Sequence, residues 1–425
     1  MAPIDEAAGV TTTNWAGNIE YAAARWHAPT SAAEVRRIVA GATGEVRAVG
    51  TRHSFNRIAD TDGDLVSTEA LDRVLGLDAD ARTVTVEGGI RYSELAAHLH
   101  ERGWALANLA SLPHISVAGA VATGTHGSGV ANGGLATAVR ALEIVGPGGR
   151  TTQARRGDEA FDGMVVALGA LGIVTSLTLD VEPTFTVTQD VYEHLPMAAA
   201  VAHLDELLAG AYSVSLFTTW RDDEVQQVWR KRRTDGTGDG AAPDLFGATP
   251  ADRPLHPIAA LAADPCTEQL GVPGPWHERL PHFRAGATPS RGDELQSEWF
   301  VGRADAPAAL RALLALAPDL APLVLVSEIR AVAADDLWLS PCYRRPSVAF
   351  HMTWIPSWPE VAALLPRIEA ALAPFAPRPH WGKLFALPDA AVRVAYPRAA
   401  DMARLVRRLD PDGVFRNPFV DRYLP

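Results

Sequence analysis

Two short segments of the chain each carry a pair of polar side chains on an otherwise apolar background. In VLVSEIRAV, Glu328 and Arg330 are two residues apart, and in VAFHMTW, His351 and Thr353 have the same spacing. Side chains with this spacing share one face of a β-strand. The pattern leaves two hypotheses open. In the first, the pairs have only a structural role: they face solvent or form a Glu–Arg salt bridge. In the second, both strands belong to one sheet, and the four side chains converge into one site able to hold hydroxyl groups and move a proton.

A glycine-rich segment, SLPHISVAGAVATGTHGSGVANGG, covers residues 111–134. Glycine lets the backbone approach a ligand closely, and Ser and Thr hydroxyls add donors for phosphate oxygens. The glycines of the segment lack the spacing of the Rossmann fingerprint and of the P-loop. The segment therefore predicts either structural turns or a phosphate-binding wall without a standard motif.

Two single residues near glycines could also carry chemistry. His53 lies in AVGTRHSFNRIAD and Lys383 in PHWGKLF. Taken alone, a histidine or lysine beside a turn is usually a surface residue, so neither establishes a site. The other histidines show no HExxH or comparable metal-ligand spacing, and we expect no metal site.

Length and composition limit the domain number and the classes of function that are possible. A chain of 425 residues is long for one hydrophobic core and favours two domains. A net charge of −12 argues against a nucleic-acid partner, because phosphate contacts need clustered Lys and Arg. The one dense basic run, RKRRTDG at 230–236, is interpreted as a solvated loop.

Cysteine usage and hydropathy suggest a cytoplasmic protein. Cys266 and Cys342 lie far apart and form neither a CxxC pair nor a disulfide framework. The N-terminal residues have no basic and apolar regions typical of a signal peptide, and no apolar stretch is long enough to span a bilayer. We therefore expect no membrane association.

The pattern of elements predicts an α+β fold. In the first 183 residues, Thr30 or Ser31 caps a helix, a strand near 83–86 precedes a helix from Tyr92, and 141–154 form a hairpin. After residue 183, strands and helices follow in an order that suggests an antiparallel sheet with helices on one face. Residues 234–257 are interpreted as a long loop or a disordered insertion.

Three motifs, GTRHSF, SLPHISVAGAVATGTHGSG and PHWGKLF, resemble the aldonolactone and alditol (xylitol) oxidase branch of the vanillyl-alcohol-oxidase flavoprotein superfamily. The resemblance covers most of the chain, from about Asn14 to the terminal GVFRNPFVDRYLP. It implies a two-domain FAD-binding fold of the α+β class with an antiparallel-sheet substrate (cap) domain. By this resemblance, 1–183 and 380–425 form the FAD-binding domain, and 184–379 the inserted cap domain.

The resemblance also implies that FAD is attached covalently to His53 through its 8α-methyl group. Some relatives have a second tether, a cysteine in the segment PHISVAG, and since no cysteine stands there in this chain, we expect one link. The other cofactor-binding residues that the resemblance implies are Val49, Gly50, Thr51, Arg52, Ser54, Phe55, Ser111, Ser116, Gly119, Thr123, Gly124, Thr125, His126, Ile173 and Val174.

For the substrate site, the resemblance implies that a set of polar residues lines one pocket: Ser111, Glu328, Arg330, His351, Thr353 and Lys383. The expected reaction oxidises the primary C1 hydroxyl of an acyclic polyol such as xylitol or sorbitol to the aldose, with O₂ reduced to H₂O₂. Lys383 and Arg330 would stabilise the developing alkoxide. His351 would accept the proton because an ordinary imidazole pKa of about 6.5 lies near working pH, with Glu328 as the alternative.

Other functions stay open at this point. The chain resembles sugar-1,4-lactone oxidases in its HWGK and Glu-x-Arg motifs, and a dehydrogenase would pass electrons to a carrier instead of O₂. A flavin- or sugar-binding protein without turnover is a further alternative, against which the full polar set speaks. The preferred polyol and the oligomeric state are open, with a monomer favoured.

Overall fold

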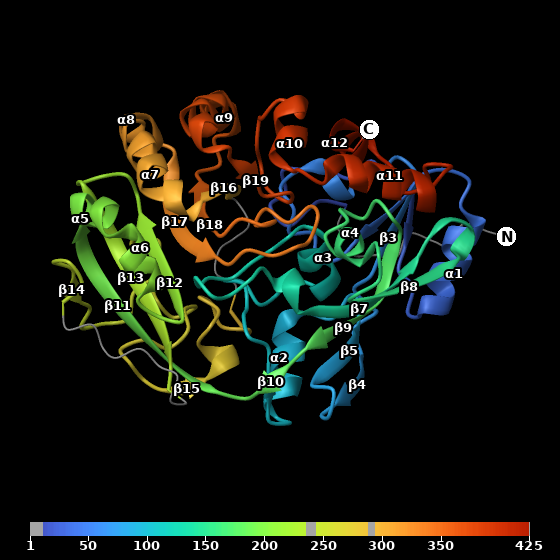
Figure 1. The fold of residues 1–425 in the computed structure, drawn as a ribbon, viewed down its shortest axis with the longest axis horizontal. Coiled ribbons are helices and arrows are strands. Elements are labelled where there is room, and N and C mark those ends of the chain that lie inside the picture. The colour runs from blue at the N-terminus through green and yellow to red at the C-terminus, as the bar shows by residue number, and fades with distance from the viewer. Residues whose placement is uncertain (1–11, 235–243, 288–293, 425) are drawn as a thin grey trace.

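The computed structural model describes residues 12–234, 244–287 and 294–424. Figure 1 shows a large sheet on the left of the molecule and smaller sheets on the right, with helices along the upper side. Helices and strands are interspersed along the chain, but most strands pair antiparallel and the helices pack beside the sheets, as in an α+β fold. One extensive cluster of buried apolar side chains, from Val84 and Leu177 to Val348 and Trp354, runs through both groups of sheets.

The first part of the chain forms three small sheets. A parallel sheet has the order β1 (Arg25–His27), β3 (Asp64–Ser67) and β2 (Val46–Val49). An antiparallel sheet has the order β4 (Val74–Asp78), β5 (Thr83–Glu87), β9 (Ile173–Asp180), β7 (Val139–Val145) and β8 (Thr151–Arg155). A short pair joins β6 (Trp104–Ala105) to β10 (Glu182–Pro183).

The helices of this part are α1 (Ala32–Gly41), α2 (Tyr92–His100), α3 (Val117–Ala122) and α4 (Phe161–Val165). Helix α1 begins where the sequence predicts, because the Ser31 hydroxyl accepts a hydrogen bond from the Glu34 N–H at 3.3 Å. The predicted strand at 83–86, the helix from Tyr92 and the hairpin β7–β8 are also confirmed.

The large sheet contains nine strands of the described chain. Its order is β14 (Thr249–Pro250), β11 (Thr186–Pro196), β13 (Glu224–Arg233), β12 (Ser213–Thr218), β17 (Val324–Val332), β18 (Ser347–Trp354), β16 (Leu295–Gly302) and β19 (Arg378–Pro379), with β15 (Gly274–Pro275) also paired to β11. The pairing within this sheet is antiparallel. Since β17 and β18 are adjacent interior strands, the hypothesis of solvent-facing edge pairs is wrong.

Helices cover the face of this sheet that β18 lines with Phe350, Met352 and Trp354, whose side chains belong to the main core. They are α5 (Met197–Ala202), α6 (Leu204–Ala209), α7 (Ala306–Leu314), α8 (Ala317–Leu320) and α9 (Trp358–Leu372). Figure 1 shows α5 to α9 along one side of the sheet. The other face of β17 and β18 is left to polar residues.

The C-terminal segment returns to the N-terminal sheets (Figure 1). It contains α10 (Asp389–Ala395), α11 (Ala399–Leu409) and α12 (Pro418–Tyr423). The N–H of Val46 donates to the carbonyl of Val414 at 2.7 Å, and the N–H of Phe55 donates to that of Gly382 at 2.8 Å. Segments more than 300 residues apart in sequence are thereby joined.

One prediction about local structure is wrong. The basic run 230–233 is not a solvated loop but the end of strand β13, where Arg230 and Lys231 are buried. Its consecutive charges hide the alternation of the strand: Arg230 donates to the carbonyl of Gly210, whereas Lys231 points to the opposite face. Of the predicted loop 234–257, residues 235–243 lie outside the described residues, and the described part contains β14. In the described residues, no helix has the length and apolar character needed to cross a bilayer.

Candidate active site

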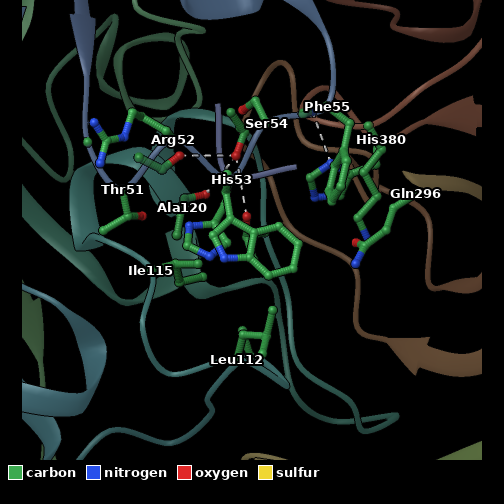
Figure 2. Close-up of a pocket in the computed structure, with 18 of the residues that line it drawn as sticks. Thr51, Arg52, His53, Ser54, Phe55, Leu112, Ile115, Ala120, Gln296 and His380 are labelled. Atoms are coloured by element: carbon green, nitrogen blue, oxygen red, sulfur yellow. Dashed lines mark hydrogen bonds between the residues drawn. The ribbon is translucent and has the colours of Figure 1, made fainter. Parts of the chain in front are cut away.

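One cavity lies between the N-terminal sheets and the large sheet (Figure 2). One wall comes from the loop after β2, from the glycine-rich segment and from residues 168–174. The opposite wall comes from β16, β17 and β18 and from the loop at 380–383. The glycine-rich segment and the polar strand pairs, more than 190 residues apart in sequence, therefore face one space.

His53 lines the first wall, and Figure 2 places it between the loop 51–55 and the segment that carries Leu112 and Ile115. The indole of Trp15 stacks on its imidazole, with ring centroids 5.1 Å apart and an interplanar angle of 20°. Burial lowers the pKa of His53 to about 4, so the ring is neutral at pH 7. Its Nδ1 atom is buried and has no hydrogen-bond partner in the described part of the chain.

Backbone N–H groups make up much of the same wall. Within the described residues, those of Thr51, His53 and Ser54 donate to no protein acceptor. Arg52 has a left-handed φ of 59°, a conformation that turns successive N–H groups toward one side, as in anion-binding nests. A Cβ atom added at Gly50 would lie 2.2 Å from the Ser116 hydroxyl, so glycine allows the two segments to approach closely.

Most of the residues implied by the resemblance for the cofactor line this cavity. They are Val49, Gly50, Thr51, Arg52, His53, Ser54, Phe55, Ser111, Ser116, Gly119, Thr123, Thr125, His126 and Val174. Gly124 and Ile173 do not: Gly124 packs against Pro341, and Ile173 is buried in the core cluster under α1. Leu168, Gly169 and Gly172 line the cavity in this region instead.

These residues fit a flavin dinucleotide. Backbone amides without a protein acceptor, together with glycines that allow close contact, can bind a pyrophosphate without many Lys or Arg side chains. Such binding is consistent with the net negative charge of the protein. A neutral, partnerless imidazole nitrogen on the same wall suits attachment to a cofactor. The described residues contain no group of three His, Cys, Asp or Glu side chains placed to hold a metal ion.

The opposite wall has a row of three ionisable side chains on adjacent strands. His351 on β18 lies opposite Glu328 on β17 and opposite Glu298 on β16. Thr353, one step along β18, lies opposite Gln296. Because side chains alternate along strands, these residues share one face, and all five line the cavity.

Two cations pair with the two carboxylates. Lys383 Nζ donates to Glu298 Oε2 at 2.8 Å. Arg330 lies 3.3 Å from Glu298 and 3.4 Å from Glu328, and it donates to the Ser111 hydroxyl at 3.1 Å. These four charged side chains carry no net charge together. Glu298, whose side chain is fully buried, contacts both cations and is the centre of the network.

The hydrogen bonds of His351 define its tautomer. Lys383 Nζ lies 2.9 Å from Nδ1, and the Thr353 hydroxyl lies 3.0 Å from Nε2. Since an ammonium only donates, Nδ1 accepts and Nε2 carries the proton. We expected an ordinary imidazole pKa for His351 from the sequence, and this expectation is wrong: burial, reinforced by Lys383, lowers the pKa of His351 to about 3.

The other groups respond to burial and to one another. Burial lowers the pKa of Lys383, and the charge of Glu298 opposes that shift. The pKa of Glu298 lies well below its usual value, because Lys383 and His126 outweigh the effect of burial. Glu328 shifts in the same direction, chiefly through Arg330 and His282. Both carboxylates are therefore ionised at neutral pH.

Sequence reasoning missed three residues of this site: Glu298, Gln296 and His282, whose Nε2 lies 2.7 Å from Glu328. Glu298 and Gln296 are two apart in LQSEWFVG, the same spacing that revealed the pairs on β17 and β18. That signal was present for β16. His282 lies in a loop, PHF, where no periodicity marks it.

Comparison with known proteins identifies the family. Residues 23–155 match the model of an FAD binding domain, and residues 288–423 match that of D-arabinono-1,4-lactone oxidase. The chain is 50% identical to the alditol oxidase of a Streptomyces species, over 96% of this chain and 97% of that protein. It is 30% identical to L-gulono-1,4-lactone dehydrogenase of Mycobacterium tuberculosis, over 97% and 98% of the two chains.

Among solved structures, cholesterol oxidase from B. sterolicum has a TM-score of 0.76 at 16% identity, covering 100% of both chains. This similarity shows the fold, an α+β FAD-binding fold of the vanillyl-alcohol-oxidase type with an antiparallel-sheet cap. The lactone-oxidising relatives are the more distant in sequence. The chain belongs to the alditol oxidase family of FAD-dependent oxidases, within the vanillyl-alcohol-oxidase superfamily.

Proposed function

We propose that the protein oxidises the primary C1 hydroxyl of an acyclic polyol, such as xylitol or sorbitol, to the aldose and reduces O₂ to H₂O₂. The observation that carries this proposal is the charge-balanced polar wall in which Glu298 and Glu328 offset Arg330 and Lys383. A neutral polyol needs hydrogen-bond donors and acceptors rather than a surplus of one charge. The alditol oxidase relative supports the same substrate class.

The cofactor occupies the glycine-rich side of the cavity in this proposal. The amides of Thr51, His53 and Ser54 bind its pyrophosphate, and His53 holds it covalently through a single bond to the 8α-carbon. The buried, partnerless Nδ1 and the neutral ring support this assignment. When bound, FAD supplies the two-electron acceptor for hydride from the C1 carbon.

The domain arrangement follows from the same placement. Residues 1–183 and 380–425 form the FAD-binding domain, and 184–379 form the inserted cap domain. The hydrogen bonds from Val46 to Val414 and from Phe55 to Gly382 support this division. Lys383 then reaches the substrate from the returning segment, immediately after β19.

Lys383 and Arg330 stabilise the negative charge that develops on the substrate oxygen as hydride departs. The ground-state hydroxyl is neutral, so a cation placed at that oxygen favours the transition state over the bound substrate. Both cations line the cavity and are largely removed from solvent, which strengthens their effect.

His351 accepts the hydroxyl proton at Nδ1 when the ammonium of Lys383 turns from the imidazole to the substrate oxygen. Before that, Nδ1 is occupied by Lys383, and the low pKa keeps the ring neutral. After proton transfer, the imidazolium lies between Glu298 and Glu328, whose charges both raise the pKa of His351. The two carboxylates that flank His351 in the row therefore stabilise its protonated ring. Ser111 and Thr353 bind further hydroxyls.

Anaerobic mixing of the purified holoenzyme with substrate tests the proposal. Xylitol or sorbitol is expected to bleach the flavin absorption band, and admission of O₂ to restore it with one H₂O₂ per aldose, because each oxidation releases two electrons and two protons. Bleaching by a sugar 1,4-lactone without bleaching by polyols would refute the substrate assignment. Recovery with an artificial acceptor but not with O₂ would refute the oxidase half-reaction.

A further inference from the structure

Lys231 is a buried lysine on β13 that does not line the cavity. Only 1% of the residue is exposed. Its Nζ lies 2.6 Å from the carbonyl of Leu280, 2.9 Å from that of Pro281 and 3.1 Å from Nδ1 of His282. Within the described residues, no carboxylate lies within ion-pair distance of it. Burial lowers the pKa of Lys231 well below its usual value, but the charge of Glu328 opposes this shift, and three acceptors surround Nζ to receive the three N–H groups of an ammonium.

The contact with Lys231 determines how His282 faces the active site. Because Nδ1 accepts from the ammonium, the ring proton resides on Nε2, which donates to Glu328 Oε1 at 2.7 Å. With the other tautomer, an imidazole lone pair would face a carboxylate that can only accept. Burial holds the pKa of His282 at about 4, so the ring stays neutral. Lys231 therefore fixes a donor toward Glu328.

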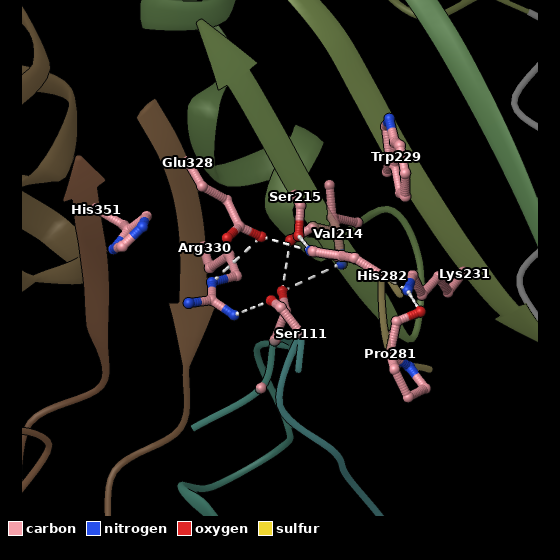
Figure 3. Close-up of polar contacts among 12 residues, drawn as sticks. Ser111, Val214, Ser215, Trp229, Lys231, Pro281, His282, Glu328, Arg330 and His351 are labelled. Atoms are coloured by element: carbon pink, nitrogen blue, oxygen red, sulfur yellow. Dashed lines mark hydrogen bonds and ion pairs between the residues drawn. The ribbon is translucent and has the colours of Figure 1, made fainter. Parts of the chain in front are cut away.

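His282 also closes a ring of polar contacts around the substrate wall (Figure 3). Its backbone N–H donates to the carbonyl of Ser111 at 3.1 Å, while the Ser111 hydroxyl accepts from Arg330. Arg330 in turn lies 3.4 Å from Glu328. The ring joins the cap strand β17 to the glycine-rich segment, and Lys231 contacts it from outside the cavity.

We propose that Lys231 is a positioning residue for substrate binding, acting through His282 to hold Glu328 as an oriented, ionised acceptor for a polyol hydroxyl. Glu328 binds this hydroxyl equally in the ground state and in the transition state. Loss of its orientation leaves its charge opposite His351 in place, so it weakens substrate binding and leaves the rate of hydride transfer largely unchanged. The inference rests on the proposed function, because it concerns a bound polyol.

The test is anaerobic flavin reduction by xylitol, measured in FAD-loaded variants as an apparent Kd and a limiting rate. Lys231→Met is expected to raise the Kd about tenfold, the scale of one lost charge-assisted hydrogen bond, with a limiting rate within about twofold of wild type. Lys231→Arg keeps the cation and its donors and is expected to restore most of the affinity.

Arg230→Met is the matched control. Arg230 is also a buried cation on β13, but it faces Gly210 on the opposite side of the strand. It is expected to lower thermal stability without changing the Kd for xylitol. An equal rise of the Kd in Arg230→Met and Lys231→Met would show general loosening of the sheet and would overturn the proposal.

Two substitutions of His282 test the same link without altering the strand. His282→Gln keeps an N–H near the position of Nε2 and is expected to bind xylitol nearly as wild type. His282→Asn lacks that reach and is expected to bind it about tenfold more weakly. The reverse order, or a wild-type Kd in folded Lys231→Met, would refute the role. If wild type itself is not bleached by xylitol, the proposed function fails instead.

Discussion

The two walls of the cavity offer different kinds of groups to the ligands proposed for them. The wall at 49–55 and 111–126 offers glycines, small hydroxyls and backbone amides, together with His53, whose buried Nδ1 has no partner within the described residues. The wall on β16 to β18 offers side chains that hold one another through charge. Backbone recognition depends on local conformation, so single side-chain changes affect it little. A buried charge network depends on every member.

The largest effect expected on the first wall is loss of the covalent link. In the proposed arrangement, His53→Ala abolishes attachment but leaves the amides of Thr51 and Ser54, so FAD should bind without being tethered. Acid precipitation is expected to leave wild-type protein yellow and to release all FAD from His53→Ala. A colourless wild-type pellet with free FAD in the supernatant would contradict the assignment.

On the second wall, Glu298→Gln should destabilise the protein far more than a substitution at a residue that offers only its backbone N–H to the first wall. It leaves two buried cations without their shared partner, which costs about 3–5 kcal/mol of stability. Glu298 raises the pKa of Lys383 against the effect of burial, so its loss lowers that pKa and Lys383 loses its proton at a lower pH.

The pH profile of the limiting flavin-reduction rate measures this change. Its alkaline limb is expected to move down by about 1–3 pH units in Glu298→Gln, the range for loss of an opposite charge within contact distance. Glu369→Gln provides a control, because Glu369 is a buried carboxylate bonded to Trp299 but does not line the cavity. An unshifted limb in Glu298→Gln would show that Glu298 does not set the protonation of Lys383.

The smallest effect expected is that of Thr353→Ala. Thr353 contributes one neutral hydroxyl at the edge of the network, where it accepts from His351. Its removal should weaken xylitol binding by about 1 kcal/mol, or roughly fivefold, with little change in limiting rate. A loss of rate as large as that of a cation variant would place Thr353 at the reacting oxygen.

The difference between the walls also explains what the sequence could predict. Glycines and hydroxyls gathered in 111–134 indicated either structural turns or a backbone wall, and the spacing of Glu328 with Arg330 and of His351 with Thr353 predicted their shared faces. Gln296 and Glu298 have the same spacing, and this signal was overlooked; strand order, which brings Glu298 beside both cations, cannot be read from spacing.

Lys231 shows a second limit to prediction from the sequence. Four consecutive basic residues resemble a solvated loop, yet β13 buries Arg230 and Lys231 on opposite faces. Burial of a cation depends on acceptors from distant segments, here the carbonyls of Leu280 and Pro281. The ordinary pKa assumed for His351 failed for the same reason, because desolvation is a property of the assembled site.

The central claim is that the charged wall acts on the transition state, and Lys383→Met tests it most directly. Stopped-flow bleaching of the flavin against xylitol concentration separates binding from reaction, with FAD content matched to wild type. The account predicts a limiting rate lower by about 100-fold or more, the scale for losing one oriented electrostatic partner, with a much smaller change in apparent Kd. A wild-type limiting rate reached only at higher xylitol concentration would contradict it and make Lys383 a binding residue.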